Sequence, residues 1–159
     1  MQYSDSQAQQ LHHRHRLSCR HPGAGETEGW LMGLVVHADI VCYDLDGNAV
    51  SASAERPYLE RFIHGEIYRA RPDVMAVVHS HSPSVIPFGV TGSRLRPIYH
   101  MAGFLGSGSA HFEIRDHGGN TDMLIRNREL GAALAGSLGQ CTCVLMRGHG
   151  STVVGQSVE

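Results

Sequence analysis

The chain has 159 residues, a formal net charge of −2 at pH 7 and 42% hydrophobic residues. This length fits one domain with a real core, and the charge balance gives no electrostatic case for binding nucleic acid or an anionic membrane. No apolar run approaches the roughly 18 residues of a membrane span. The N-terminus lacks the apolar core of a secretory signal, and the 4 cysteines form no zinc-finger or disulfide framework. A reducing cytoplasm is therefore the expected compartment.

Residues 1–30 are predicted to be an irregular, His-rich arm, and residues 31–159 the folded domain. The histidines and arginines of residues 12–16 show neither helical nor strand periodicity, and residues 22–25 are typical of a loop. A His-rich tract can bind metal, but a solvated or disordered arm is the favoured interpretation.

The ordered part begins near residue 38. Residues 40–43 predict a strand, and Asp46-Gly47 is a strong turn signal. Residues 58–70 carry apolar side chains close to helical spacing, which predicts an amphipathic helix. A β-branched run over residues 74–78 then predicts a buried strand.

Three histidines stand at the ends of predicted strands. His79 and His81 follow the strand at residues 74–78, and side chains two apart on a strand point to the same face. His149 follows a second predicted strand, residues 141–146, and its flanking glycines let the backbone come close. If the two strands are neighbours in a sheet, the three imidazoles meet. Three histidines with one position left open are a usual arrangement for catalytic zinc.

The remaining elements are less regular. A short helix is expected near residues 82–86, and residues 98–105 are ambiguous. Asp122 is expected to cap a helix that runs to about residue 138, with Gly139 ending it. Residues 151–159 are too few for another helix of typical length. Cys141 and Cys143 share one face of their strand and are predicted to be core thiols rather than metal ligands.

A metal bound by three neutral histidines needs a base before it can support carbon–carbon bond chemistry. Glu60 is the candidate, because it lies on the helix that leads into His79. Glu66 is the rival on the same helix, but six residues on it points to another face. His64 lies one turn after Glu60, where it would orient the carboxylate.

Two further groups of polar residues are weaker candidates for a functional site. Glu113, Asp116 and His117 form a cluster for which a solvated loop is the favoured interpretation. Arg94 and Arg96 are candidates for holding an anionic substrate, although surface arginines commonly have no such role.

Taken together, Glu60-x3-His64, Arg71-Pro72-Asp73, residues 77–81 and residues 148–150 resemble the class II aldolase/adducin family. That family includes sugar-phosphate aldolases, ribulose-phosphate 4-epimerase and metal-dependent decarboxylases. The resemblance implies an α/β fold: a three-layer α/β/α arrangement around a mainly antiparallel sheet. It also implies a homotetramer with sites between subunits and a small-molecule substrate.

The resemblance also implies residue roles. His79, His81 and His149 would bind Zn²⁺, or Mn²⁺ as in some members, and Glu60 would be the acid/base. The aldolases' tyrosine proton donor, which comes from a neighbouring subunit, falls on His100 here.

The family's phosphate loop corresponds to residues 16–20, where Ser18 and Arg20 remain as substrate-binding candidates. The chain also resembles a family core shortened at both ends. The function expected is a metal-dependent carbon–carbon lyase, and the His100 replacement and the altered phosphate loop favour decarboxylation over aldol cleavage. The alternatives are a 4-epimerase, an adducin-like scaffold without catalysis, and a truncated remnant.

Overall fold

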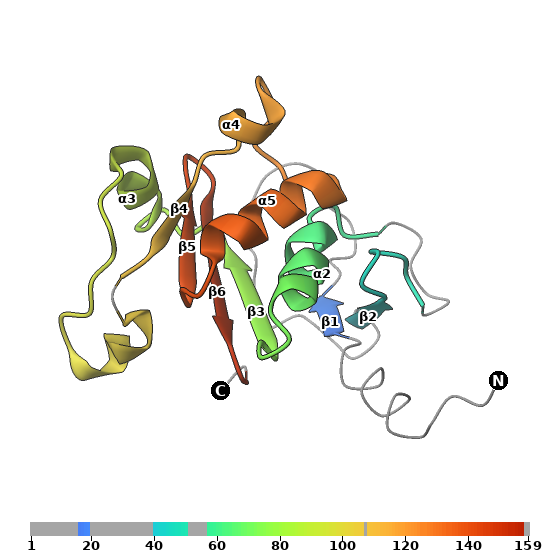
Figure 1. The fold of residues 1–159 in the computed structure, drawn as a ribbon, viewed down its shortest axis with the longest axis horizontal. Helices are drawn as coiled ribbons and strands as arrows, with labels where there is room; N and C mark the ends of the chain where they lie inside the picture. Colours follow the sequence, from blue (N-terminus) through green and yellow to red (C-terminus); the bar gives the residue numbers. More distant parts are fainter. Residues whose placement is uncertain (1–15, 20–39, 51–56, 107, 158–159) are drawn as a thin grey trace.

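Figure 1 shows the chain as a computed structural model, which describes residues 16–19, 40–50, 57–106 and 108–157. The strands are β1 (Arg16–Cys19), β2 (Ile40–Tyr43), β3 (Ala76–Ser80), β4 (Ala110–Phe112), β5 (Cys143–Met146) and β6 (Gly150–Gly155). The helices are α2 (Arg61–Ala70), α3 (Ile86–Thr91), the 3-10 helix His100–Leu105, α4 (Arg115–Gly118) and α5 (Arg128–Leu138). In the described ranges, no helix is both long and apolar enough to cross a membrane.

A four-stranded sheet in the order β3-β6-β5-β4 forms the centre of the fold. The pairs β3–β6 and β6–β5 are antiparallel, and β5–β4 is parallel. The sheet is therefore mainly antiparallel, as predicted. β1 and β2 form a separate antiparallel pair.

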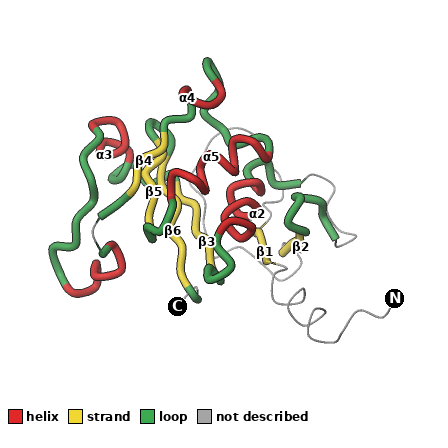
Figure 2. The backbone as a smooth tube through the Cα atoms, in the orientation of Figure 1, coloured by secondary structure: helices red, strands yellow, loops and turns green. Residues whose placement is uncertain are grey.

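Helices cover both faces of the sheet (Figures 1 and 2), with α2 and α5 on one side and α3 on the other. The burial of β5 agrees with this arrangement, since all four of its residues are buried. Val144 and Met146 join the core beneath α2 and α5, whereas Cys143 and Leu145 point to the opposite face and are buried as well. The expected three-layer α/β/α arrangement is confirmed.

The packing of α2 against α5 supplies much of the core. Ile63 and Ile67 recur at helical spacing on α2 and are fully buried. Gly131 on α5 lets the two helix backbones approach, because a Cβ at that position would lie 2.6 Å from the carbonyl oxygen of Phe62. The core that these helices share with the sheet includes Phe112, Leu130, Leu134, Leu138, Val144, Met146 and Val154.

Polar contacts fix both ends of this helix pair. Buried Glu66 accepts a hydrogen bond from Arg128 Nε at 2.8 Å, which ties α2 to the start of α5. Arg71, just after α2, binds Asp73 and donates to the carbonyl oxygen of Gly139 at 2.6 Å. The sequence feature Arg71-Pro72-Asp73 thus joins the C-terminal ends of the two helices.

Helix α5 begins later than the sequence predicts. Its N-cap is Asn127, whose side chain accepts from Leu130 N at 2.9 Å, and not Asp122. The chain cannot be helical through Met123, because the φ angle of this residue is +69°. Residues 121–126 therefore form a non-helical segment that precedes α5.

Three strands were not predicted: β1, β4 and β6. β6 overlaps residues 151–159, which are too few for another helix of typical length but enough for a strand, because a strand needs fewer residues than a helix. β1 lies inside the segment expected to be irregular, so that expectation is wrong for Arg16–Cys19. The rest of the predicted arm, residues 1–15 and 20–30, lies outside the described residues, and the domain boundary near residue 31 stays a prediction.

Gly131→Ala should lower the free energy of unfolding by about 1 to 2 kcal/mol. Overpacking costs about 1 to 3 kcal/mol, and the added Cβ would face the Phe62 backbone, which cannot rotate away. Gly136→Ala is the matched control on the same helix, where a Cβ meets nothing within 4 Å. The control should gain about 0.5 to 1 kcal/mol from helix propensity. Urea unfolding measures both, and equal effects in the two variants would contradict the close helix packing.

Candidate metal centre

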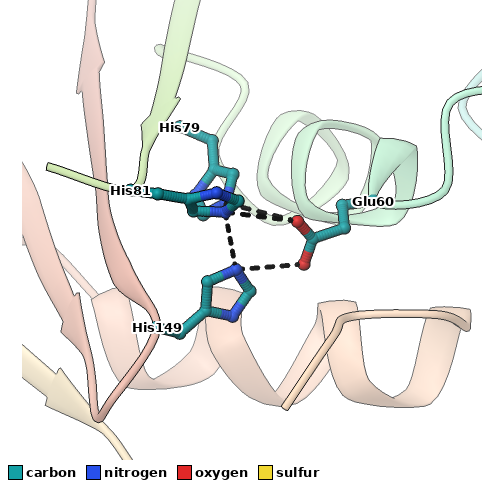
Figure 3. A group of neighbouring side chains, drawn as sticks. All are labelled: Glu60, His79, His81 and His149. Atoms are coloured by element: carbon teal, nitrogen blue, oxygen red, sulfur yellow. Dashed lines mark hydrogen bonds and ion pairs between the residues drawn. The ribbon is translucent and has the colours of Figure 1, made fainter. Parts of the chain in front are cut away.

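Glu60, His79, His81 and His149 converge on one point (Figure 3). One ligand atom from each residue lies within 4.8 Å of all the others. The Nε2 atom of His81 is 2.8 Å from that of His79 and 2.8 Å from that of His149. The Glu60 carboxylate faces the three rings, with Oε2 3.4 Å from His79 Nε2 and Oε1 3.4 Å from His149 Nε2. The four residues that the sequence analysis selected thus meet in space.

The order of the strands explains how His149 reaches the other two histidines. β3 and β5 are not direct neighbours, which was the condition under which the sequence analysis expected the imidazoles to meet, because β6 lies between them. His149 sits in the turn from β5 to β6, and β6 pairs with β3 in a register that sets Thr152 opposite His79. A Cβ at Gly150 would collide with the carbonyl oxygen of Ser80. Glycine at this position therefore permits the close approach that the sequence analysis expected.

Hydrogen bonds from the far side of the ring orient His79. Its Nδ1 lies 3.1 Å from the carbonyl oxygen of Ser151 and 3.2 Å from Thr152 Oγ1. The Thr152 hydroxyl donates its own hydrogen to Met146 Sδ at 3.5 Å, so its oxygen is left to accept. His79 therefore carries its hydrogen on Nδ1, and the lone pair of Nε2 points to the centre of the cluster.

His149 is oriented in the same way by a backbone carbonyl. Its Nδ1 donates to the carbonyl oxygen of Met123 at 2.7 Å. Thr121 Oγ1 accepts from Met123 N at 2.8 Å and helps to hold the unusual backbone of Met123 in place. Gly148, with φ of +69°, leaves room for the Met123 side chain, since a Cβ there would lie 2.8 Å from Met123 Cε. The segment before α5 thus packs against the turn that follows β5.

Glu60 is the N-cap residue of α2, and only 4% of it is exposed. Its Oε1 atom accepts a hydrogen bond from Ile125 N at 3.1 Å. Burial by itself raises the pKa of the Glu60 carboxyl, but the rings of His149 and His79, which donate through Nε2 when they are protonated, and the Ile125 N–H outweigh the burial and hold the pKa well below its usual range. Glu60 is therefore an ionised, buried carboxylate.

This donor set suits a divalent cation. Burial lowers the pKa of His149, but the hydrogen bond and charge of Glu60 outweigh it and raise this pKa, so without a cation a proton on Nε2 offsets the carboxylate charge. In their neutral forms His79 and His149 keep their hydrogens on Nδ1, and both Nε2 lone pairs then point where a cation would take the place of that proton. Burial and the neighbouring charges of His79 and His149 lower the pKa of His81, which favours its neutral, ligating form. The His81 side chain is 57% exposed, whereas those of His79 and His149 are 4% and 6% exposed. The cluster is therefore open on the side of His81.

Glu66, the alternative candidate for the base, and His64, the residue expected to orient Glu60, both lie outside the cluster. Glu66 points to another face of α2 than Glu60 does, as predicted, and it pairs there with Arg128 of α5 and has no part in the cluster. His64 packs edge-on against Tyr58, and no hydrogen bond joins it to Glu60 within the described part of the chain. Ile125 N occupies the orienting role that the sequence analysis suggested for His64.

Three other predicted site residues lie outside this cluster. His100 is exposed at the start of the 3-10 helix, and its ring contacts that of Tyr99. Ser18 lies in β1, and Arg20 is outside the described residues. The predicted roles of these three residues stay predictions.

The alternative polar residues show no ligand-like geometry. Arg94 and Arg96 are exposed on the segment between α3 and the 3-10 helix. Glu113 pairs with Arg115 and Arg147 at the surface and is not a ligand. Cys143 is buried, and its pKa is raised to about 11 by burial and by Cys141, as befits a core thiol.

The residues that orient the ligands were not found from the sequence. Met123 and Ile125 act through their backbone atoms, so side-chain type carries no signal for them. Thr152 is one of two buried polar residues of β6, together with Ser151. A buried threonine three residues after a candidate ligand is a signal that could have been read, had β6 been recognised.

For a divalent cation held by the cluster, Thr152→Val should weaken binding about 10- to 100-fold, because it removes an acceptor that orients His79. Thr152→Ser keeps the hydroxyl and should bind within a few-fold of the parent. Competition with a chromogenic chelator measures the affinities, and thermal unfolding without metal tests whether both variants fold. Equal metal affinity in the valine and serine variants would contradict this role.

Comparison with known proteins agrees with this geometry. The family described as Class II Aldolase and Adducin N-terminal domain matches residues 25–159. Decarboxylase tropJ of Talaromyces stipitatus is 39% identical over 170 residues, which cover 92% of this chain and 64% of that protein. The 3,4-dihydroxyphthalate decarboxylase of Arthrobacter keyseri is 37% identical over 126 residues, covering 77% of this chain and 50% of that protein.

Among solved structures, an aldolase II superfamily protein from Pseudomonas syringae superposes with a TM-score of 0.64 at 25% identity. The match covers 89% of this chain and 57% of that one. This chain thus spans between half and two thirds of the length of these relatives. The family match covers most of the chain and confirms the resemblance seen in the motifs. The chain belongs to the class II aldolase and adducin family.

Proposed function

We propose that this protein is a metal-dependent carbon–carbon lyase that decarboxylates a small hydroxy- or oxo-substituted carboxylate. The observation that carries the proposal is the buried Glu60 carboxylate facing three histidine Nε2 atoms. Three histidines that can hold a metal ion lie beside an ionised carboxylate. The metal ion would act as a Lewis acid and the carboxylate as a proton carrier, and cleavage of a carbon–carbon bond next to an oxygen substituent requires both. The two relatives described above are named decarboxylases, which supports decarboxylation over aldol cleavage.

His79, His81 and His149 would hold the metal, with Zn²⁺ as the first choice and Mn²⁺ as the alternative, since imidazole suits several divalent ions. When bound, the metal supplies a positive charge next to the substrate oxygens, where negative charge develops as the bond breaks. The open side at His81 is where a small substrate has access to the cluster.

Glu60 would carry the proton. As an ionised carboxylate it accepts the proton of a substrate hydroxyl group, and the ring or chain carbon then keeps the electron pair of the breaking carbon–carbon bond as carbon dioxide leaves. Glu60 afterwards returns the proton to that carbon. The hydrogen bond from Ile125 N keeps Oε1 in place, so that Oε2 is the oxygen that is free to exchange a proton.

The proposal includes an assembly of identical subunits, a homotetramer, in which His100 of one copy takes part in the site of another. Several apolar side chains around His100 are strongly exposed in the single chain, and Ile98 reaches 91%. Such a patch is typical of a protein interface. The exposed members are Ile98, Tyr99, Met101 and Phe104. Ser18 and Arg20 remain the proposed substrate-binding residues of the N-terminal segment, and the cytoplasm the proposed location.

Glu60→Gln should leave the metal bound and lower turnover at least 100-fold, because a carboxamide cannot carry the proton. His149→Ala should instead lose most of the metal, since it removes a buried ligand. Metal content by mass spectrometry and carbon dioxide release from 3,4-dihydroxyphthalate are the two measurements.

His117→Ala is the control, because this exposed histidine lies outside the cluster. It should change neither measurement. Normal turnover in Glu60→Gln would refute the acid/base role, and full metal retention in His149→Ala would refute the ligand set.

Ile98→Asp should shift the protein towards smaller species, because a charge in an apolar interface loses its hydration on assembly. Val50→Asp is the control, an equally apolar and 56% exposed residue near β2, outside the proposed interface. Sedimentation over a dilution series measures the masses. A wild-type monomer at all concentrations with full activity would rule out sites shared between subunits.

A further inference from the structure

An ion pair joins the two ends of a segment whose backbone contacts the metal cluster. The segment between α4 and α5 touches the cluster at two backbone atoms, the Met123 carbonyl oxygen on His149 and the Ile125 N–H on Glu60. Asp122 immediately precedes the first contact, and Arg126 immediately follows the second. Both charged residues are therefore anchored one residue away from an atom that is bonded to the site.

Asp122 holds Arg126 in a defined position. The two side chains form an ion pair, and Asp122 Oδ1 also accepts from Leu124 N at 3.2 Å. Within the described residues, only Nη2 of Arg126 is engaged, which leaves Nε and Nη1 as donors. The Arg126 side chain is 49% exposed. A guanidinium that is fixed on one side and accessible on the other can receive a planar anion.

Arg126 and Glu60 carry opposite charges and are linked through Ile125, whose N–H donates to Glu60 Oε1. The hydrogen bond with Asp122 and, more weakly, the negative charge of Glu60 raise the pKa of Arg126. The guanidinium is thus within electrostatic reach of the buried carboxylate. An anionic substrate that approaches the cluster is repelled by Glu60, and a second cation near the cluster offsets that repulsion.

We propose that Arg126 binds a carboxylate of the substrate that remains on the product, with Asp122 as the residue that positions it. The substrate class is accordingly a dicarboxylate, aromatic or oxo-substituted, with one carboxylate lost and one retained. This inference rests on the proposed decarboxylase function and specifies its substrate.

The choice of the retained carboxylate follows from the chemistry. The departing group changes from a carboxylate into neutral carbon dioxide, so a cation held on it would stabilise the ground state more than the transition state and slow the reaction. A cation on the retained carboxylate contributes binding and orientation without that cost.

Phthalate tests this inference, because it has two neighbouring carboxylates but no hydroxyl group through which to react. Calorimetry on the full chain loaded with Zn²⁺ should show that Arg126→Gln weakens phthalate binding about 10- to 100-fold, the loss expected for a hydrogen-bonded charge pair. Arg126→Lys should recover part of this loss, because it restores the charge without the planar fork.

Arg115→Gln is the matched control. Arg115 is also an exposed arginine paired with a carboxylate, that of Glu113, so the substitution removes the same charge away from the cluster. It should bind phthalate like the wild type. Undiminished affinity in Arg126→Gln, an equal loss in Arg115→Gln, or a wild-type protein that does not bind phthalate would each overturn the inference.

Metal content separates this inference from the function on which it rests. Arg126→Gln should keep its metal, and loss of metal in this variant would mean that Arg126 only supports the cluster, which also overturns the inference. Phthalate binding that depends on Arg126, combined with turnover that does not depend on Glu60, would refute the proposed chemistry and leave the anion site standing.

Discussion

The burial of the Glu60 charge is the constraint on which the rest of this structure depends. An ionised carboxylate that is 4% exposed carries a large desolvation penalty, which only nearby positive or donating groups can offset. Its partners come from separate parts of the chain: His79 from β3, His149 from the turn between β5 and β6, and Ile125 from the segment before α5. The carboxylate can be buried only when all of these elements are assembled, so fold and site form together.

This dependence explains features that would otherwise be costly. Met123 has a φ angle of +69°, which a residue with a side chain adopts at a cost of about 1 kcal/mol or more. In return, its carbonyl oxygen points at His149 Nδ1, at 2.7 Å. The start of α5 at Asn127 rather than at Asp122 has the same origin, because the intervening residues must cross the site before the helix can begin.

The sequence predicts the ligands well because their signals are local. The alternation in His79-Ser80-His81 and the glycines around His149 are both visible in short stretches, and Glu60 stands at the start of an evident apolar stripe. The strand order is not local, so the short sequence patterns do not reveal that β6 lies between β3 and β5. Backbone contacts are not local either, and side-chain chemistry does not reveal them.

The three histidines differ in how firmly the surrounding protein holds them. His79 and His149 are buried, and each is held through Nδ1 by an acceptor from the protein, so their positions are set by the fold. His81 follows β3, and its side chain is more than half exposed. The contacts of its ring are those of Nε2 with the Nε2 atoms of His79 and His149. A site with two ligands held by the fold and a third ligand exposed to solvent combines a defined location for the cation with access for a substrate. The segment that orients His149 and Glu60 through its backbone also carries the Asp122–Arg126 pair. In the proposed substrate binding, this one segment links the orientation of the ligands to the recognition of an anion.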